Sequence, residues 1–240
     1  MINFIKKVLQ KTLFYDRWTC NGCGKEIFEN YFCEDCLNKI TQISENKCAH
    51  CGRLTVYPVK FCDSCKEVNI NFDRALSVFD YKEPISYLIQ NFKYKNHKYH
   101  AKYFAEMLYS LYEKEGLEVD VVTYVPMHED RLEERKYNHA ELLASEFSSL
   151  CKIEMKKLIE KVKETERQAT LSFKDRLKNL SSSFRVIKSE VDAKRVLVID
   201  DVLTTGATAD TIAKTLKKAG AKEVIILTVA SVSRLKNDEE

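Results

Sequence analysis

Residues 195–230, RVLVIDDVLTTGATADTIAKTLKKAGAKEVIILTVA, predict a strand, a helix and a second strand in succession. The apolar runs at 195–200 and 223–230 are typical of buried strands, and 207–220 has helical periodicity that stops at Gly220. A strand–helix–strand unit of this length has parallel strands joined by a right-handed crossover. We therefore expect an α/β fold with a parallel central sheet.

The loop between the first strand and the helix is the first candidate binding site. In open parallel sheets, ligands bind beyond the carboxyl ends of the strands. At that position the sequence TTGAT can present successive backbone amides and three hydroxyls at a helix N-terminus, which favours a phosphate. The loop contains no lysine, so it is not a Walker A loop. Its residues are Thr204, Thr205, Gly206, Ala207 and Thr208.

Two adjacent acids, Asp200 and Asp201, precede this loop. Carboxylates repel a phosphate, but they accept hydrogen bonds from two vicinal hydroxyls or bind Mg²⁺. A ligand with a phosphate next to a diol is a ribose 5-phosphate. The alternative interpretation is a strand end with solvated acids and a capping threonine.

Eight of the nine cysteines form four CxxC pairs, and the pairs repeat. CNGCGKEIFENYFCEDC spans 20–36 and CAHCGRLTVYPVKFCDSC spans 48–65. Two such knuckles supply a tetrahedral Cys₄ zinc site, so we predict two structural zinc ions, held within each ribbon or across ribbons. Redox motifs of this type come singly, and Cys151 is left as a packed or surface residue. The predicted ligands are Cys20, Cys23, Cys33, Cys36, Cys48, Cys51, Cys62 and Cys65.

Composition adds few constraints. The 240 residues carry a formal charge of +3, which eight thiolates and two Zn²⁺ would change to −1, so global basicity is no argument for nucleic acid. No apolar run approaches the length of a membrane span. Residues 1–19 have helical spacing, and we expect a short helix packed on the protein rather than one lying on a membrane surface.

Residues 196–209 resemble the signature that binds phosphoribosyl pyrophosphate (PRPP) in type I phosphoribosyltransferases. The resemblance implies that the 204–208 loop cradles the 5-phosphate and that Asp200 and Asp201 meet the ribose hydroxyls. It also implies Mg²⁺ between those hydroxyls and the pyrophosphate.

Three more segments, and the paired ribbons, resemble the ComF family in the same order: YKEPISYLIQNFKY (81–94), VPMHEDRLEERKYNHAELLA (125–144) and TERQATLSFKDRLKNLSSSF (165–184). The resemblance implies a Rossmann-like type I phosphoribosyltransferase fold behind a small Cys₄ zinc-ribbon module. The expected divisions are an N-terminal helix at 1–19, the double zinc ribbon at 20–68, the phosphoribosyltransferase-type domain at 69–234 and an acidic tail at 235–240.

The segment 125–144 departs from the family at two positions. The family's arginine-glycine-aromatic-Asn-Gln run reads Arg135, Lys136, Tyr137, Asn138, His139 here. Because VPMHEDR leaves a strand at the same carboxyl edge, residues 126–131 are a candidate pyrophosphate loop, and arginines supply charge-assisted hydrogen bonds. The alternative for the arginines is a solvated helix face. The candidate residues on this side are Met127, Arg131, Arg135 and Lys136.

Two further segments have open alternatives. Residues 165–176 are a candidate mobile flap with Gln168 and Arg176, or a plain surface loop. Residues 91–104 interleave Lys93, Lys95, Lys98 and Lys102 with five aromatics and no acid, which favours single-stranded DNA. The alternatives there are a solvated basic face or a lysine that reaches PRPP.

By resemblance, we expect a cytoplasmic protein that binds PRPP with Mg²⁺ and handles single-stranded DNA during natural transformation. A ComFA-type helicase and other competence proteins are the implied partners. The alternatives are an active phosphoribosyltransferase of nucleotide metabolism and a non-catalytic DNA-binding adaptor. The intact acids and TTGAT loop argue against a decayed site, and no segment identifies an acceptor base.

Overall fold

The computed structural model describes residues 19–27, 31–95, 97–163, 180, 183–187 and 191–233. A four-stranded sheet lies at its centre, and all of its pairings are parallel. Val198 lies opposite Ile226 on one side and opposite Thr123 on the other. The parallel α/β fold is therefore confirmed. In spatial order the strands are β1 (Arg74–Asp80), β6 (Glu223–Ser231), β5 (Arg195–Leu203) and β2 (Val121–Tyr124).

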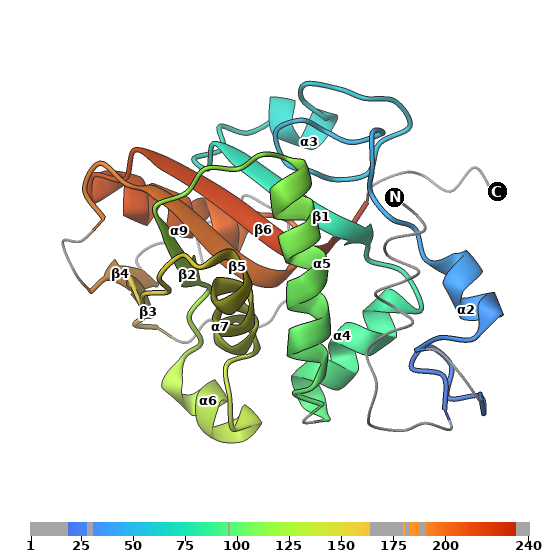
Figure 1. The fold of residues 1–240 in the computed structure, drawn as a ribbon. Coiled ribbons are helices and arrows are strands. Elements are labelled where there is room, and N and C mark those ends of the chain that lie inside the picture. Colours follow the sequence, from blue (N-terminus) through green and yellow to red (C-terminus); the bar gives the residue numbers. More distant parts are fainter. Residues whose placement is uncertain are drawn as a thin grey trace.

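Helices cover both faces of the sheet (Figure 1). α5 (His100–Lys114) and α7 (His139–Cys151) lie on one face, and α9 (Ala207–Lys218) lies on the other. α4 (Ile85–Tyr94) packs beside α5. The smaller elements are α2 (Glu34–Lys39), α3 (Asp63–Lys66), α6 (Glu129–Arg135) and the antiparallel pair β3 (Ile159–Lys161) and β4 (Phe184–Val186).

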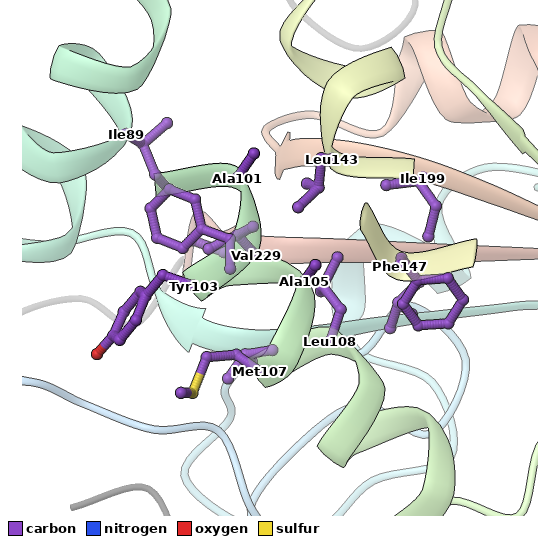
Figure 2. Close-up of a cluster of buried hydrophobic side chains, with 14 of the residues drawn as sticks. Ile89, Ala101, Tyr103, Ala105, Met107, Leu108, Leu143, Phe147, Ile199 and Val229 are labelled. Atoms are coloured by element: carbon purple, nitrogen blue, oxygen red, sulfur yellow. The ribbon is translucent and has the colours of Figure 1, made fainter. Parts of the chain in front are cut away.

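The core between the sheet and α5 is made from complementary apolar faces (Figure 2). Leu108 of α5 and Phe147 of α7 are fully buried with Ile199 of β5 and Val229 of β6. Each fully buried side chain of this kind contributes about 1.5–3 kcal/mol relative to exposure. This packing fixes the direction of β5, and so the position of the residues that follow its buried part.

The cysteine-rich part packs against both faces at the β1 side. Tyr31 and Phe32 of the first ribbon join the α5 core, and Cys48 and Cys51 of the second join the α9 core. The linker between the ribbons runs antiparallel to the outer edge of β1. On the opposite side of the sheet, the amide of Val122 donates to the Glu154 carbonyl at 3.0 Å. Both edges of the sheet are thus paired.

The two strands and the helix expected within 195–230 are confirmed, and the expected loop at 126–131 needs a correction. The expected loop at 126–131 ends early, because α6 begins at Glu129. His128 is extended there, and Glu129 and Asp130 lie in the first turn, where acids favour a helix start. No helix of the described residues is long and apolar enough to cross a bilayer. Residues 1–18 of the N-terminal helix expected at 1–19, and the acidic tail at 235–240, lie outside the described residues.

Candidate functional site

An acidic pair lies near the carboxyl end of β5. Asp201 is 2% exposed, and its two carboxylate oxygens face Lys93 and His139. Nζ of Lys93 lies 2.9 Å from Oδ1, and Nε2 of His139 lies 2.9 Å from Oδ2. Asp200 is half-buried and accepts a hydrogen bond from the amide of Asp201 at 2.9 Å. The buried charge of Asp201 is therefore compensated from two directions.

The ends of two helices bring Lys93 and His139 to β5. Lys93 lies in the last turn of α4, and His139 is the first residue of α7. Asn138 caps α7, because its Oδ1 accepts from the Ala140 amide at 3.0 Å and its Nδ2 donates to the Val125 carbonyl at 3.1 Å. These two hydrogen bonds fix the start of α7 after β2 and place the His139 ring next to Asp201. Asparagine is among the residues preferred at this N-cap position.

Burial and neighbouring charge push the pKa values of the two acids apart. Burial alone would raise the pKa of Asp201, but Lys93 and His139 together hold it well below its ordinary value. Burial, together with the charge of Asp201, raises the pKa of Asp200 to about 7. Near neutral pH the pair therefore holds one firm negative charge beside a second carboxyl that can gain or lose a proton.

The loop after β5 has the form of an anion cradle. Gly206 precedes α9 with φ of 91°, a left-handed conformation that favours glycine. The amide of Asp210 donates to the Gly206 carbonyl at 2.8 Å, which starts the helix, and the Ala207 amide reaches Oγ1 of Thr205 at 3.4 Å. Thr204 is exposed. The first-turn amides of α9 and the threonine hydroxyls lie at the same end of β5 as the acids.

The residues predicted for the pyrophosphate side lie in and around α6. Arg131 and Arg135 belong to that helix, and Met127 is half-buried before it. Nη2 of Arg135 donates to the Tyr94 hydroxyl at 2.9 Å, and its guanidinium lies 4.6 Å from the ring centroid. Lys136 caps α6 in the left-handed conformation, with φ of 68°. This explains why a glycine suits the position, and it exposes the lysine side chain.

The four lysines of 91–104 do not form one exposed patch. The Lys93 ammonium is directed to Asp201, so the alternative of a lysine at the PRPP side fits it better than a DNA contact. Lys95 lies 5.2 Å from the Tyr87 ring centroid, and Lys98 lies 4.9 Å from that of Tyr137. Lys102 is exposed on α5.

The eight ribbon cysteines form two clusters, one in each ribbon. Cys20, Cys23, Cys33 and Cys36 converge in the first, and Cys48, Cys51, Cys62 and Cys65 in the second. Sulfur separations of 3.6–4.0 Å occur between knuckles, as for Cys51–Cys62 and Cys48–Cys65. Zn–S bonds of about 2.3 Å in a tetrahedron place sulfurs about 3.8 Å apart, so the donor sets fit zinc. The pairing that the sequence left open is within each ribbon.

Two side chains of this region escaped the sequence analysis. His139 stood out only as a departure from the family run, and nothing in its local sequence indicated a contact with Asp201. Arg53, which directly follows a CxxCG knuckle, donates from Nη2 to the Thr204 carbonyl at 2.5 Å. Gln168 and Arg176 of the candidate flap lie outside the described residues.

Comparison with known proteins extends beyond the α/β part. Residues 140–240 match the family described as "Phosphoribosyl transferase domain". The chain is 33% identical over 213 residues to Competence protein F of Haemophilus influenzae, covering 85% of this chain and 92% of that protein. It is 32% identical over 201 residues to Competence protein ComFC of Streptococcus pneumoniae, covering 82% and 86%. It is 29% identical over 199 residues to DNA utilization protein YhgH of Salmonella typhimurium, covering 80% and 86%.

Proposed function

The chain belongs to the ComF family, and on that premise we propose that it binds PRPP with Mg²⁺ and acts in the handling of single-stranded DNA. The observation that carries the PRPP proposal is the placement of Asp200 and Asp201 beside the 204–208 loop at one end of β5. Amides and hydroxyls suit the 5-phosphate, and carboxylates suit the ribose diol. The order of these groups along the chain matches the order of phosphate and diol along the ligand.

The cationic and anionic groups have separate tasks in this proposal. Lys93 and His139 keep Asp201 ionised, so that it accepts hydrogen bonds from the ribose hydroxyls. Arg131, Arg135 and Lys136 supply donors for charge-assisted hydrogen bonds to a pyrophosphate in and next to α6. Asp200 and Asp201 place carboxylate oxygens within 4.8 Å of one another, which suits Mg²⁺. Mg²⁺ there would neutralise phosphate charge and stabilise a departing pyrophosphate.

Calorimetric titration with PRPP and Mg²⁺ tests this assignment. Wild type should bind, and an Asp200→Asn/Asp201→Asn double variant should lose the heat, because its neutral amides are weaker acceptors for the diol and bring no negative charge to the cation. Glu118→Gln is the matched control, since that acid is 81% exposed and pairs with Arg195 at the opposite end of β5. Equal heats from wild type and the double variant would sink the diol assignment.

Pyrophosphate release would then distinguish an enzyme from a binding module. We propose that PRPP is retained as a ligand and that transfer requires an acceptor. Incubation with PRPP, Mg²⁺ and either bases or single-stranded DNA, followed by a pyrophosphate assay, measures this. Release in the presence of one acceptor, absent in the double variant, would establish phosphoribosyl transfer and identify its acceptor class.

The DNA role is supported by exposed aromatic rings next to cations. Tyr94 is 54% exposed and carries the Arg135 guanidinium over its ring, and Tyr87 is 36% exposed with Lys95 over it. Base stacking with phosphate contact is how single strands are held without sequence preference. By the same proposal, the protein works in the cytoplasm with competence proteins such as a ComFA-type helicase.

Fluorescence anisotropy with a labelled single-stranded oligonucleotide tests the surface. A Tyr94→Ala/Lys95→Ala variant should bind more weakly, by about 1–3 kcal/mol for the lost stack, and with a flatter salt dependence. Tyr57→Ala is the control, because Tyr57 is 73% exposed on the second ribbon. An unchanged salt slope in the double variant would dismiss this surface.

A further inference from the structure

The second cysteine cluster contacts the phosphate loop through one buried arginine. Arg53 is 5% exposed and directly follows Cys51 and Gly52 of the second ribbon's first knuckle. Its Nη2 donates to the Thr204 carbonyl at 2.5 Å, across 151 residues of sequence. Its own carbonyl accepts from the Cys48 amide at 2.9 Å, which closes the knuckle. Arg53 therefore joins a metal-binding turn to the loop after β5.

The knuckle that holds Arg53 is itself seated tightly on the sheet. Gly52 has φ of +67°, and a Cβ there would lie 2.4 Å from the Ala75 carbonyl oxygen and 2.8 Å from Cα of Leu76. The Ala75 amide donates to the His50 carbonyl at 2.7 Å. Only glycine permits this approach, so the second cluster packs directly against the backbone of β1. Arg53 transmits that fixed position to Thr204.

Peptide geometry links the arginine contact to phosphate binding. The carbonyl of Thr204 and the amide of Thr205 belong to one planar trans unit, so they point in opposite directions. When Arg53 holds the carbonyl, the Thr205 amide is turned away from the ribbon. A second contact fixes the far side of the loop, because the Asn71 amide and Nδ2 donate to the Asp210 carboxylate at 2.6 and 3.0 Å. Asp210 lies in the first turn of α9.

We propose that Arg53 is a positioning residue for the phosphate loop, through which the second Cys₄ centre sets the affinity for PRPP. Arg53 does not touch the ligand in this proposal, because its guanidinium is buried against a backbone carbonyl. The proposal rests on the proposed PRPP function for its affinity effect. Its effect on the loop itself is independent of that function.

Two measurements on three arginine variants test the proposal. Arg53→Met keeps the aliphatic volume but removes the donors, Arg53→Lys restores one charged donor, and Arg185→Met is the control at an exposed pair with Glu160. Amide hydrogen exchange across 204–208 should quicken about tenfold in Arg53→Met, as expected for the loss of one charged hydrogen bond. PRPP affinity in the presence of Mg²⁺ should weaken by a similar factor. Arg53→Lys should recover part of both, and zinc content should be the same throughout.

The outcomes separate this proposal from the proposed function. Wild-type exchange and affinity in an Arg53→Met variant with intact zinc would overturn the positioning role. A wild-type protein that gives no heat with PRPP would overturn the proposed function, while the exchange measurement still tests the contact. If Arg53→Met loses zinc, Arg53→Gln replaces it, because the glutamine stays polar but is too short to reach the Thr204 carbonyl. Unchanged exchange in zinc-loaded Arg53→Gln would then refute the coupling.

Discussion

His100 is a buried imidazole that couples the first ribbon to α5. It has no exposed surface, and its Nδ1 shares a hydrogen bond with the Tyr31 hydroxyl, whose ring stacks on Tyr103 at 4.3 Å. Nε2 of His100 is buried with no hydrogen bond from the described residues. Burial, helped by His97, lowers the pKa of His100 to about 3. The folded protein therefore holds this ring in its neutral form.

The sign of the resulting pH effect follows from linkage. With a pKa of about 6.5 when unfolded and about 3 when folded, His100 binds a proton more readily in the unfolded chain. Its contribution to stability is complete above about pH 6.5 and is lost as the pH falls toward 3. Between pH 7.5 and pH 5 the loss is about 2 kcal/mol of unfolding free energy.

Urea unfolding at pH 7.5 and pH 5 measures this loss. The comparison is between wild type and His100→Asn, whose amide nitrogen takes the place of Nδ1 without a titrating ring. Zinc thiolates also bind protons at pH 5, but they do so in both proteins, so the difference between the two pH effects isolates His100. His128→Asn is the control, because His128 is partly buried before α6 and is not among the groups that lower the pKa of His100. An identical pH effect in wild type and His100→Asn would refute the reasoning.

Three further predictions concern the α6 cap, the acidic pair and the metal. Lys136→Gly should raise the unfolding free energy by about 1 kcal/mol, because it relieves a left-handed lysine, whereas Lys214→Gly at an exposed position inside α9 should lower it by a similar amount. Lys93→Met should lower the unfolding free energy, measured in urea, by about 3 kcal/mol, because it leaves the buried Asp201 carboxylate without its lysine partner. The Lys93→Met/Asp201→Asn double variant should recover part of that loss, and an equal loss in the single and double variants would contradict the prediction. Elemental analysis should find two zinc ions in wild type and one in Cys62→Ser, and a zinc-free wild type would defeat the ribbon assignment.

Local patterns were sufficient for the elements that build the site. The apolar runs of β5 and β6 are buried on both faces, and α9 stops near Gly220, which has φ of 97°. Asn138 caps α7 because a short polar side chain next to an apolar periodic segment has few other conformations that satisfy it. Such features depend on neighbours within a few residues, and the sequence contains them directly.

Contacts between distant segments could not be read in this way. Lys93, His139 and Asp201 come from three elements, and only the packing of α4 and α7 around β5 brings them together. Residues 91–104 show a single lysine-rich pattern in the sequence, although their four lysines lie in α4, in α5 and between the two helices and face different surroundings. The cysteine spacing was compatible with either pairing, because a knuckle specifies two ligands of a site and not the other two. Arg53 had no local signal, since its contact depends on how the second ribbon sits on β1.

The linker between the two ribbons has a consequence for solubility. The Ile43 amide donates to the Val78 carbonyl, and the Asp80 amide to the Thr41 carbonyl, each at 2.9 Å. An open strand edge can pair with a strand of another chain. These two hydrogen bonds occupy the outer edge of β1, which would otherwise be open. A truncated chain that starts at residue 69 would bare this edge, and we expect it to self-associate through β1. The linker between the two ribbons thus protects the β1 edge from edge-to-edge association with another chain.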